Sequence, residues 1–196
     1  MNTIKVILGS TRPSRFGEQP ANWIMELSKA HPETKFELVD LKEVNLPLLD
    51  EPVPASAQQY TQQHTKDWAK IVDSADGFIF VTAEYNHSIP GALKNAIDFV
   101  AREWMHKPVA YVSYGAEAGG QRSVEQLRQI AGWHRMYDLG EFVAIPNYWT
   151  QLDKEGKFMP NDTQKAAAEA MLKSIIFWTE KMKPAREELK AQAQAK

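Results

Sequence analysis

Hydroxyl and guanidinium groups gather in a short segment near the N-terminus, residues 9–17 (GSTRPSRFG). Ser10 and Thr11 offer hydroxyls, Arg12 and Arg15 offer guanidinium groups, and Gly17 stands just before a helical pattern. A helix N-terminus is electropositive and its first N–H groups lack partners, so it stabilises an anion. Arginine adds bidentate, charge-assisted hydrogen bonds. The segment predicts a site for a single terminal phosphate, with an ordinary surface turn as the alternative. It matches neither GxxxxGK[ST] nor GxGxxG, so no triphosphate or pyrophosphate site is predicted.

A second polar segment, residues 82–88 (TAEYNHS), follows the apolar run FIFV at residues 78–81. Backbone groups of a kinked loop and the Asn86 amide can recognise the edge of a planar heterocycle, while Tyr85 walls the pocket. Glu84 is either a base or metal ligand or, as we prefer, a support for the loop. We interpret His87 as a loop or partner-contact residue rather than a catalyst.

A third segment, residues 113–120 (SYGAEAGG), contains three glycines. Glycine has no side chain to keep the backbone away from a ligand, so this segment can approach one closely. The alternative is a flexible connection without a ligand.

Strand patterns alternate with helical patterns along the chain. Apolar, β-branched runs predict strands at residues 3–8, 36–41, 78–81, 108–114 and 142–145. This alternation is typical of an α/β fold with a parallel, doubly wound sheet. We favour the flavodoxin-like strand order 2-1-3-4-5, which places the three polar segments side by side at the carboxyl ends of neighbouring strands.

The chain is expected to form one domain, residues 1–184, with irregular stretches at 42–58 and 146–160. The last helix is predicted from Thr163 to Lys183, with Asn161 or Asp162 as its cap and Pro184 as its end. Residues 185–196 have no apolar face to bury and are expected to fray.

Composition excludes several classes of function. The 196 residues are 43% hydrophobic and carry a net charge of −2, so we expect no nucleic-acid or membrane partner. The chain has no cysteine, which excludes disulfides, thiolate metal sites and cysteine nucleophiles. Without a signal peptide or an apolar run of about 18 residues, we expect a cytoplasmic protein.

The three segments together resemble the family of NADPH-dependent FMN reductases, which includes quinone, chromate and azo-dye reductases. The resemblance rests on GSTRPSRFG, TAEYNHSIPGALKNAIDF and SYGAEAGGQRSVEQLR, and covers roughly residues 3–145. It implies bound FMN, NADPH or NADH as co-substrate, and a small-molecule acceptor such as a quinone, azo dye, metal oxyanion or free flavin.

The resemblance also implies which residues bind FMN. The first segment would hold the phosphate, the second would wrap the isoalloxazine and the third would close over the ring. The implied residues are Ser10, Arg12, Arg15, Gly17, Ala83, Glu84, Tyr85, Asn86, Ser113, Tyr114 and Gly115. Ala83 stands where the family usually has proline, which should loosen the loop but adds an N–H donor. Which side chain between Ser14 and Gly17 meets the phosphate stays open.

The implied mechanism is a two-electron ping-pong cycle. Because the cofactor carries the chemistry, no acid–base arrangement is needed, and none is found in the sequence. Arg122 can attract the phosphates of the nicotinamide cofactor or can be a solvated helix residue, and the sequence favours neither.

Family members are usually dimers or tetramers, so the resemblance implies a homo-oligomer. Bulky residues near the end of the helix after the third strand (Phe99, Trp104, Met105), and Trp133, Met136 and Tyr137, are candidates for the interface or for the core. A flavodoxin-like electron carrier and a non-catalytic FMN-binding module are the competing functions. Carriers are usually strongly acidic, and a net charge of −2 argues against that class.

Overall fold

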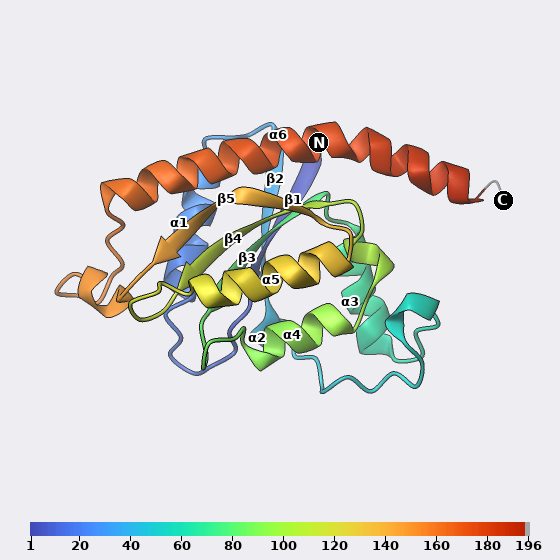
Figure 1. Ribbon diagram of the computed structural model, residues 1–196, viewed down its shortest axis with the longest axis horizontal. Helices are drawn as coiled ribbons and strands as arrows, with labels where there is room; N and C mark the ends of the chain where they lie inside the picture. Colours follow the sequence, from blue (N-terminus) through green and yellow to red (C-terminus); the bar gives the residue numbers. More distant parts are fainter. Residues whose placement is uncertain (195–196) are drawn as a thin grey trace.

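A computed structural model describes residues 1–194 of the protein and shows five parallel strands in the order 2-1-3-4-5 (Figure 1). The strands are β1 Asn2–Leu8, β2 Thr34–Asp40, β3 Gly77–Ala83, β4 Pro108–Tyr114 and β5 Tyr137–Ile145. The predicted flavodoxin-like sheet is confirmed. Every residue of β3 and β4 is buried, because helices cover both faces of a parallel sheet.

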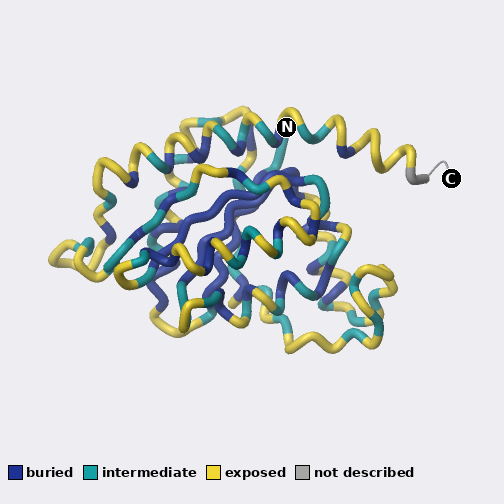
Figure 2. The backbone as a smooth tube through the Cα atoms, viewed as in Figure 1, coloured by how far each residue is buried: buried dark blue, intermediate teal, exposed yellow. Residues whose placement is uncertain are grey.

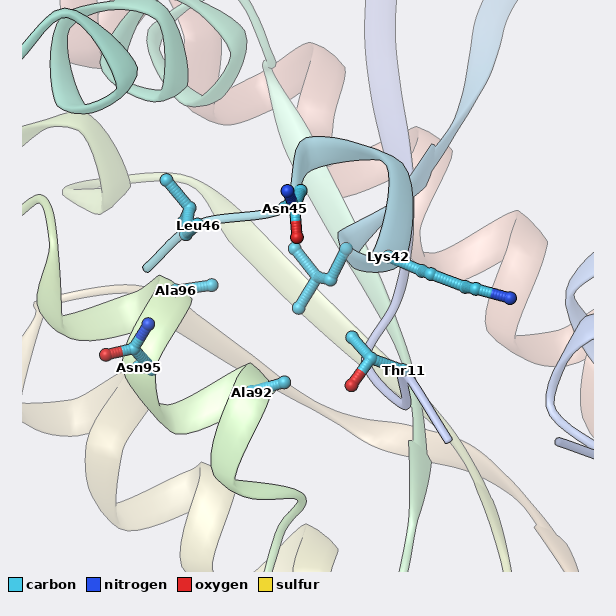
Figure 3. A pocket seen from close by; sticks show the side chains of 8 residues that line it. Thr11, Lys42, Asn45, Leu46, Ala92, Asn95 and Ala96 are labelled. Atoms are coloured by element: carbon cyan, nitrogen blue, oxygen red, sulfur yellow. The ribbon is translucent and has the colours of Figure 1, made fainter. Parts of the chain in front are cut away.

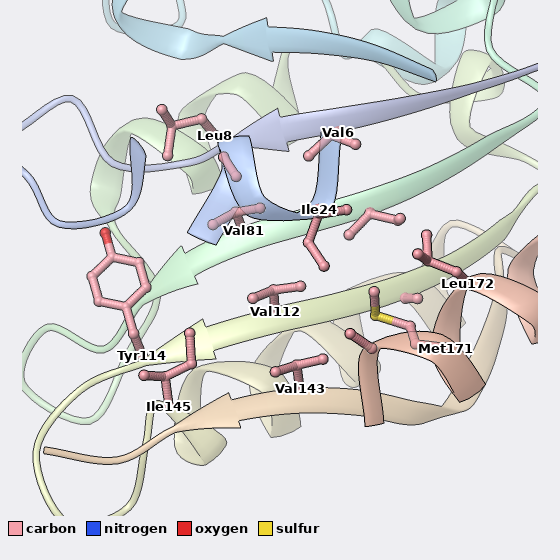
Figure 4. Packing of buried hydrophobic residues seen from close by; sticks show 14 of the residues in the cluster. Val6, Leu8, Ile24, Val81, Val112, Tyr114, Val143, Ile145, Met171 and Leu172 are labelled. Atoms are coloured by element: carbon pink, nitrogen blue, oxygen red, sulfur yellow. The ribbon is translucent and has the colours of Figure 1, made fainter. Parts of the chain in front are cut away.

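Helices α1 Glu18–Ser28 and α6 Asp162–Gln194 cover one face of the sheet. Helices α3 Gln63–Asp73, α4 Gly91–Asp98 and α5 Gln121–Trp133 cover the other. Alternate residues of β1 enter two separate cores: Val6 and Leu8 pack with α1 and α6, whereas Ile7 packs with α3, α4 and α5. Figure 4 shows the first core. Figure 2 shows the buried strands between the helices that cover the two faces of the sheet.

The stretch at 42–58, expected to be irregular, contains short elements. Helix α2 spans Leu41–Val44 and a 3-10 turn, η1, spans Ala55–Ala57. Another 3-10 turn, η3, spans Tyr148–Gln151 within the predicted 146–160 region. Strand β5 begins before the predicted Phe142, because Tyr137 pairs with Pro108 ahead of a register shift. These differences leave the sheet order unchanged.

The prediction that Phe99, Trp104 and Met105 lie on the helix after β3 is wrong. Helix α4 ends at Asp98, and a 3-10 turn, η2, spans Arg102–Trp104. Phe99 and Trp104 are fully buried, and the Trp104 indole donates a 3.1 Å hydrogen bond to the Ile97 carbonyl. Their aromatic bulk therefore belongs to the core.

The last helix does not end at Pro184, as the sequence suggested. Asn161 caps it, since its side chain accepts from the Gln164 N–H at 2.9 Å while the Gln164 side chain accepts from the Asn161 N–H. The helix then continues through Pro184 to Gln194 in place of the expected frayed tail, and residues 195–196 lie outside the described residues. Arg186 is buried and pairs with Asp76, which holds the extension against the sheet.

Among residues 1–194, no helix has both the length and the apolar character required to span a bilayer.

Candidate functional site

The carboxyl ends of β1, β3 and β4 are neighbours, and their loops meet at one cavity of about 170 Å³. We call these connections loop 1 (residues 9–17), loop 2 (84–90) and loop 3 (115–120). The cavity is lined by Arg12, Ser14, Arg15, Phe16, Ala83, Glu84, Tyr85, Tyr114, Gly115, Ala116 and Tyr148. The predicted residues Arg12, Arg15, Ala83, Glu84, Tyr85, Tyr114 and Gly115 are therefore brought together. The predicted residues Ser10, Gly17, Asn86 and Ser113 do not line this cavity.

Loop 1 offers backbone donors beside helix α1. In the part of the chain that the structure describes, the N–H groups of residues 14–17 donate to no protein acceptor. The Arg12 N–H makes only a long bond, 3.4 Å, to the Ser10 hydroxyl. The Arg12 side chain is exposed and in no ion pair within residues 1–194. These donors and this cation suit a phosphate.

Arg15 is committed to the protein itself. Its guanidinium donates to the Ser10 carbonyl at 2.6 Å, to Glu18 through Nε at 3.0 Å and to both oxygens of Asp40. Burial alone would lower the pKa of Arg15, but the bonds to Asp40 and Glu18 raise it. Since all five of its N–H groups have partners, Arg15 positions loop 1 and has no donor left for an anion in this conformation.

Loop 1 and loop 2 are joined by a hydrogen bond between two hydroxyls. The buried Ser10 Oγ lies 2.7 Å from Tyr85 Oη. Tyr85 also begins a tight turn, exchanging backbone bonds of 2.9 and 3.0 Å with Ser88. Asn86 and His87 form the exposed tip of that turn with φ values of 52° and 66°. Asn86 thus shapes the turn. It does not line the cavity, where we expected its amide to contact a heterocycle.

Glu84 joins loop 2 to the start of α5. Its carboxylate accepts from the Arg122 backbone N–H at 3.2 Å and from Arg122 Nη1 at 2.7 Å. The preferred interpretation of Glu84 as a support for the loop agrees with these contacts. Arg122 is half-exposed in this pair, so it is neither purely solvated nor entirely available to a ligand.

Ser113 organises loop 3 from beneath. It is fully buried, and its hydroxyl donates to the Gly119 carbonyl at 2.8 Å. Gly120 has a φ of 82°, and a Cβ there would lie 2.8 Å from Ser113 Cβ. The loop therefore turns tightly over Ser113 and leaves Gly115 and Ala116 to face the cavity.

Tyr114 carries a buried hydroxyl without a hydrogen-bond partner among the described residues. The residue is 5% exposed, lines the cavity and points toward loop 1 (Figure 4). A Cβ on Gly17 would lie 2.6 Å from Tyr114 Oη, so only glycine leaves room for this hydroxyl. Burial, and then the neighbouring Tyr85, raise the pKa of Tyr114, which keeps its proton available for donation. The buried Tyr114 hydroxyl and the backbone N–H groups of loop 1 are thus donors that a ligand acceptor could satisfy.

Two aromatic residues of the site were not predicted from the sequence. The rings of Phe16 and Tyr148 stack with centroids 4.4 Å apart and an angle of 23° between them. Tyr148 belongs to η3, directly beyond the carboxyl end of β5. Its position after the end of a strand could have suggested a role in the site. The irregular pattern of residues 146–160, however, did not indicate which side chains face the cavity.

A second cavity, of about 310 Å³, lies between loop 1, α2 and α4 (Figure 3). Thr11 lines it together with residues of α2, the segment that follows α2, and α4, including Lys42, Asn45 and Asn95. It contains none of the predicted FMN-binding residues. Although it is larger, it lacks the unpaired donors of loop 1, and we place the candidate site in the smaller cavity.

The sequence model of the NADPH-dependent FMN reductase family matches residues 2–150. The chain belongs to this family. It is an oxidoreductase whose cofactor is FMN and whose co-substrate is NAD(P)H. Among curated relatives, "NAD(P)H-dependent FMN reductase C4B3.06c" of Schizosaccharomyces pombe is 42% identical over 68% of this chain and 67% of its own length. A "2-hydroxy-1,4-benzoquinone reductase" of a Burkholderia species is 30% identical over 83% of this chain and 88% of its own.

Solved structures show the same fold. The flavoenzyme FerB, an NAD(P)H:(acceptor) oxidoreductase from Paracoccus denitrificans, superposes with a TM-score of 0.72. It is 21% identical to this FMN reductase family member, over 93% of this chain and 99% of its own. At this identity the likeness concerns the fold alone.

The candidate site fits the anionic end of FMN better than its ring. The unpaired N–H groups of loop 1 and the Tyr114 hydroxyl match a phosphate in chemistry. The cavity of about 170 Å³ is smaller than the roughly 300–1,000 Å³ typical of small-molecule sites.

Proposed function

We propose that this family member is a reductase of quinone-type acceptors, and that the cavity between loops 1, 2 and 3 is where it holds FMN. The observation that carries this proposal is that unpaired donors and aromatic rings meet at the carboxyl ends of β1, β3 and β4. Loop 1 donors, the exposed Arg12 and the Tyr114 hydroxyl would hold the phosphate. The backbone of Ala83 and Glu84 and the Tyr85 side chain would contact the ring system.

FMN, when bound, supplies two-electron chemistry between NAD(P)H and an acceptor. The residues of the chain bind and orient it and exclude water. The N–H groups near the start of α1, together with the helix dipole, stabilise negative charge. Among residues 1–194, no cluster of acidic or histidine side chains is arranged to hold a metal ion. The lining has aromatic faces and no unpaired carboxylate, which suits a flat, neutral acceptor.

Quinones are the acceptor class that we favour among quinones, azo dyes, metal oxyanions and free flavin. Relatives from Burkholderia and Pseudomonas putida are named as quinone reductases. The rings of Phe16, Tyr85, Tyr114 and Tyr148 make the cavity lining largely aromatic, which suits a flat, apolar acceptor such as a quinone. A site for a metal oxyanion would need a second cationic group beside Arg12. Arg15 and Arg122 are the nearby candidates, and both are paired with carboxylates.

An anaerobic experiment tests this function. Purified protein is loaded with FMN, mixed with NADPH or NADH, and then with a benzoquinone. We expect the flavin absorbance near 450 nm to bleach within seconds and to return when the quinone is added. Slow bleaching by both nucleotides would favour the electron-carrier alternative, and failure to take up FMN would favour a non-catalytic protein.

We infer that the protein forms a homo-oligomer. Trp133 is 84% exposed and Phe177 is 49% exposed, while Tyr137 packs on Trp178 nearby with ring centroids 4.7 Å apart. Exposed aromatic side chains of this size are common at interfaces. Light scattering of the wild type and of a Trp133→Glu variant tests this: a dimer or tetramer that dissociates in the variant supports it, and a monomeric wild type contradicts it.

A further inference from the structure

A hollow of about 880 Å³ lies at the amino ends of β3 and β4, between α3, η2 and the last turns of α6. Asp73, which ends α3 just before β3, and His106, which precedes β4, both line it. The candidate FMN site lies at the carboxyl ends of the same strands. Since β3 has seven residues, the two sites are separated by roughly 20 Å. A ligand in this hollow cannot take part in the flavin chemistry directly.

The lining includes apolar groups from every neighbouring element. Ala69 comes from α3, Met105 follows η2, Leu189 comes from α6, and Tyr60 lies in the loop before α3. Leu189, on α6, is 47% exposed, so its side chain offers open apolar surface to the hollow. The Tyr60 hydroxyl donates to Glu103 at 3.0 Å, so its polar end is satisfied and its ring adds apolar surface. The hollow can therefore bind an apolar body of the size usual for small-molecule ligands.

The acidic groups of the hollow are already engaged. The buried Glu103 carboxylate accepts from Tyr60, from Gln58 at 3.3 Å and from the Ala101 N–H at 3.1 Å. Asp73 pairs with Lys190 at 3.1 Å. Both carboxylates therefore have hydrogen-bond or ion-pair partners within the protein.

Two cations of the hollow remain without an acidic partner. Lys66 and Arg102 are exposed and form no ion pair within residues 1–194, whereas Lys70 pairs with Asp67 at 3.2 Å. Unpaired cations beside a low-dielectric wall create a positive potential that concentrates anions. The charge and the lining together describe a ligand with one acidic end and one apolar end.

We propose that this hollow is a second binding site, which takes a small organic anion with an apolar body, such as an aryl carboxylate or sulfonate. Lys66 and Arg102 attract the acidic group, and Tyr60, Ala69, Met105 and Leu189 contact the body. The site is separate from the FMN cavity in position and in chemistry.

The test uses FMN-loaded protein and the fluorescent probe 1-anilinonaphthalene-8-sulfonate. Bound FMN occupies the candidate active site, so the probe reports other sites. We expect the wild type to bind one equivalent, and a Lys66→Gln/Arg102→Gln variant to bind at least tenfold more weakly, because two charge-assisted contacts are lost. Binding should also weaken as salt is raised. Leu189→Asp, which puts an acid on the apolar lining, should weaken binding as well.

A matched control carries Lys154→Gln/Lys173→Gln, which removes the same charge from exposed lysines outside the hollow. This control should bind the probe like the wild type. Equal binding by all variants, release of the probe by excess FMN, or equal binding of uncharged 1-anilinonaphthalene would each overturn the proposal. Absence of probe binding together with a dimer whose contacts cover the hollow would overturn it in favour of a second copy of the chain.

Discussion

The amino and carboxyl edges of the sheet handle polar groups differently. At the amino edge, Asp76 accepts from the Thr3 N–H at 3.0 Å, from Lys183 at 3.0 Å and from Arg186. At the carboxyl edge, loop 1 and Tyr114 hold donors that have no acceptor among residues 1–194. A satisfied network stabilises the fold, whereas donors left unpaired at a cavity are available to a ligand. Substitutions at the first should change stability, and substitutions at the second should change ligand affinity.

The largest effect on stability is expected from Asp76→Ala. It leaves the buried Arg186 without its carboxylate and the Thr3 N–H without its acceptor, which should cost about 3–5 kcal/mol of unfolding free energy. Urea denaturation measures the loss. Asp67→Ala removes an exposed carboxylate and should lower the unfolding free energy far less than Asp76→Ala does. Equal losses of unfolding free energy in the two variants would contradict the stabilising role of the Asp76 network.

Two arginines of loop 1 sharpen the comparison. Arg12→Ala removes a free cation, so FMN affinity should fall by about 1.5–3 kcal/mol while the urea midpoint stays unchanged. Arg15→Ala should instead lower stability, because Asp40 loses its bidentate partner and Ser10 its donor. FMN titration and urea denaturation of both variants separate the roles. Unchanged FMN affinity in Arg12→Ala would place the phosphate elsewhere.

Gly17→Ala tests the space around the Tyr114 hydroxyl. The added Cβ would lie 2.6 Å from that oxygen and 2.9 Å from Leu8 Cδ1, so the ring must shift, at a cost of about 1–3 kcal/mol. We expect both a lower melting temperature and weaker FMN binding. Gly132→Ala in α5 is the matched control, since its Cβ meets nothing within 4 Å and should stabilise the protein slightly.

The amino edge also contains a buried lysine, Lys107, whose ammonium donates to the Val72 carbonyl at 2.8 Å and the Asp73 carbonyl at 3.0 Å. Burial lowers the pKa of Lys107 from 10.5 to about 7. Between these values the unfolded chain binds the proton that the folded chain has lost, so stability rises with pH. We expect unfolding free energy to increase by about 1–2 kcal/mol from pH 7 to 9, and this rise to be lost in Lys107→Met.

The smallest effect is expected from Tyr114→Phe, which removes only the unpaired hydroxyl. Stability should be unchanged or slightly higher, because the Tyr114 hydroxyl has no hydrogen-bond partner within the described part of the chain. FMN affinity should fall by about 0.5–1.5 kcal/mol, while affinity for riboflavin, which lacks the phosphate, should stay the same. Isothermal titration with both flavins measures this, and an equal fall for both would assign the hydroxyl to the ring.

The sheet and the convergence of its loops were predictable because they follow from local patterns. Apolar runs define the strands, and the parallel order then brings the three polar segments to one edge. The roles of individual polar residues were less predictable, because their partners are distant in sequence. Arg15 bonds to Asp40, 25 positions away, and Glu84 to Arg122, 38 positions away.

The end of α6 shows the same limit. Proline ends most helices, since it lacks an N–H and clashes with the preceding turn. Beyond Pro184, Arg186 pairs with Asp76, 110 positions earlier, and this contact joins the helix extension to the start of β3. Tyr148 entered the site in a similar way, through stacking on Phe16 that no periodic pattern encodes.

The 2.7 Å bond between Ser10 and Tyr85 has a consequence for any ligand that spans the site. It fastens loop 1 to loop 2, so a displacement of one is transmitted to the other. Analogues shortened at either end should therefore lose more affinity than the missing contacts alone predict, and cutting the link with Tyr85→Phe should make the two ends respond independently.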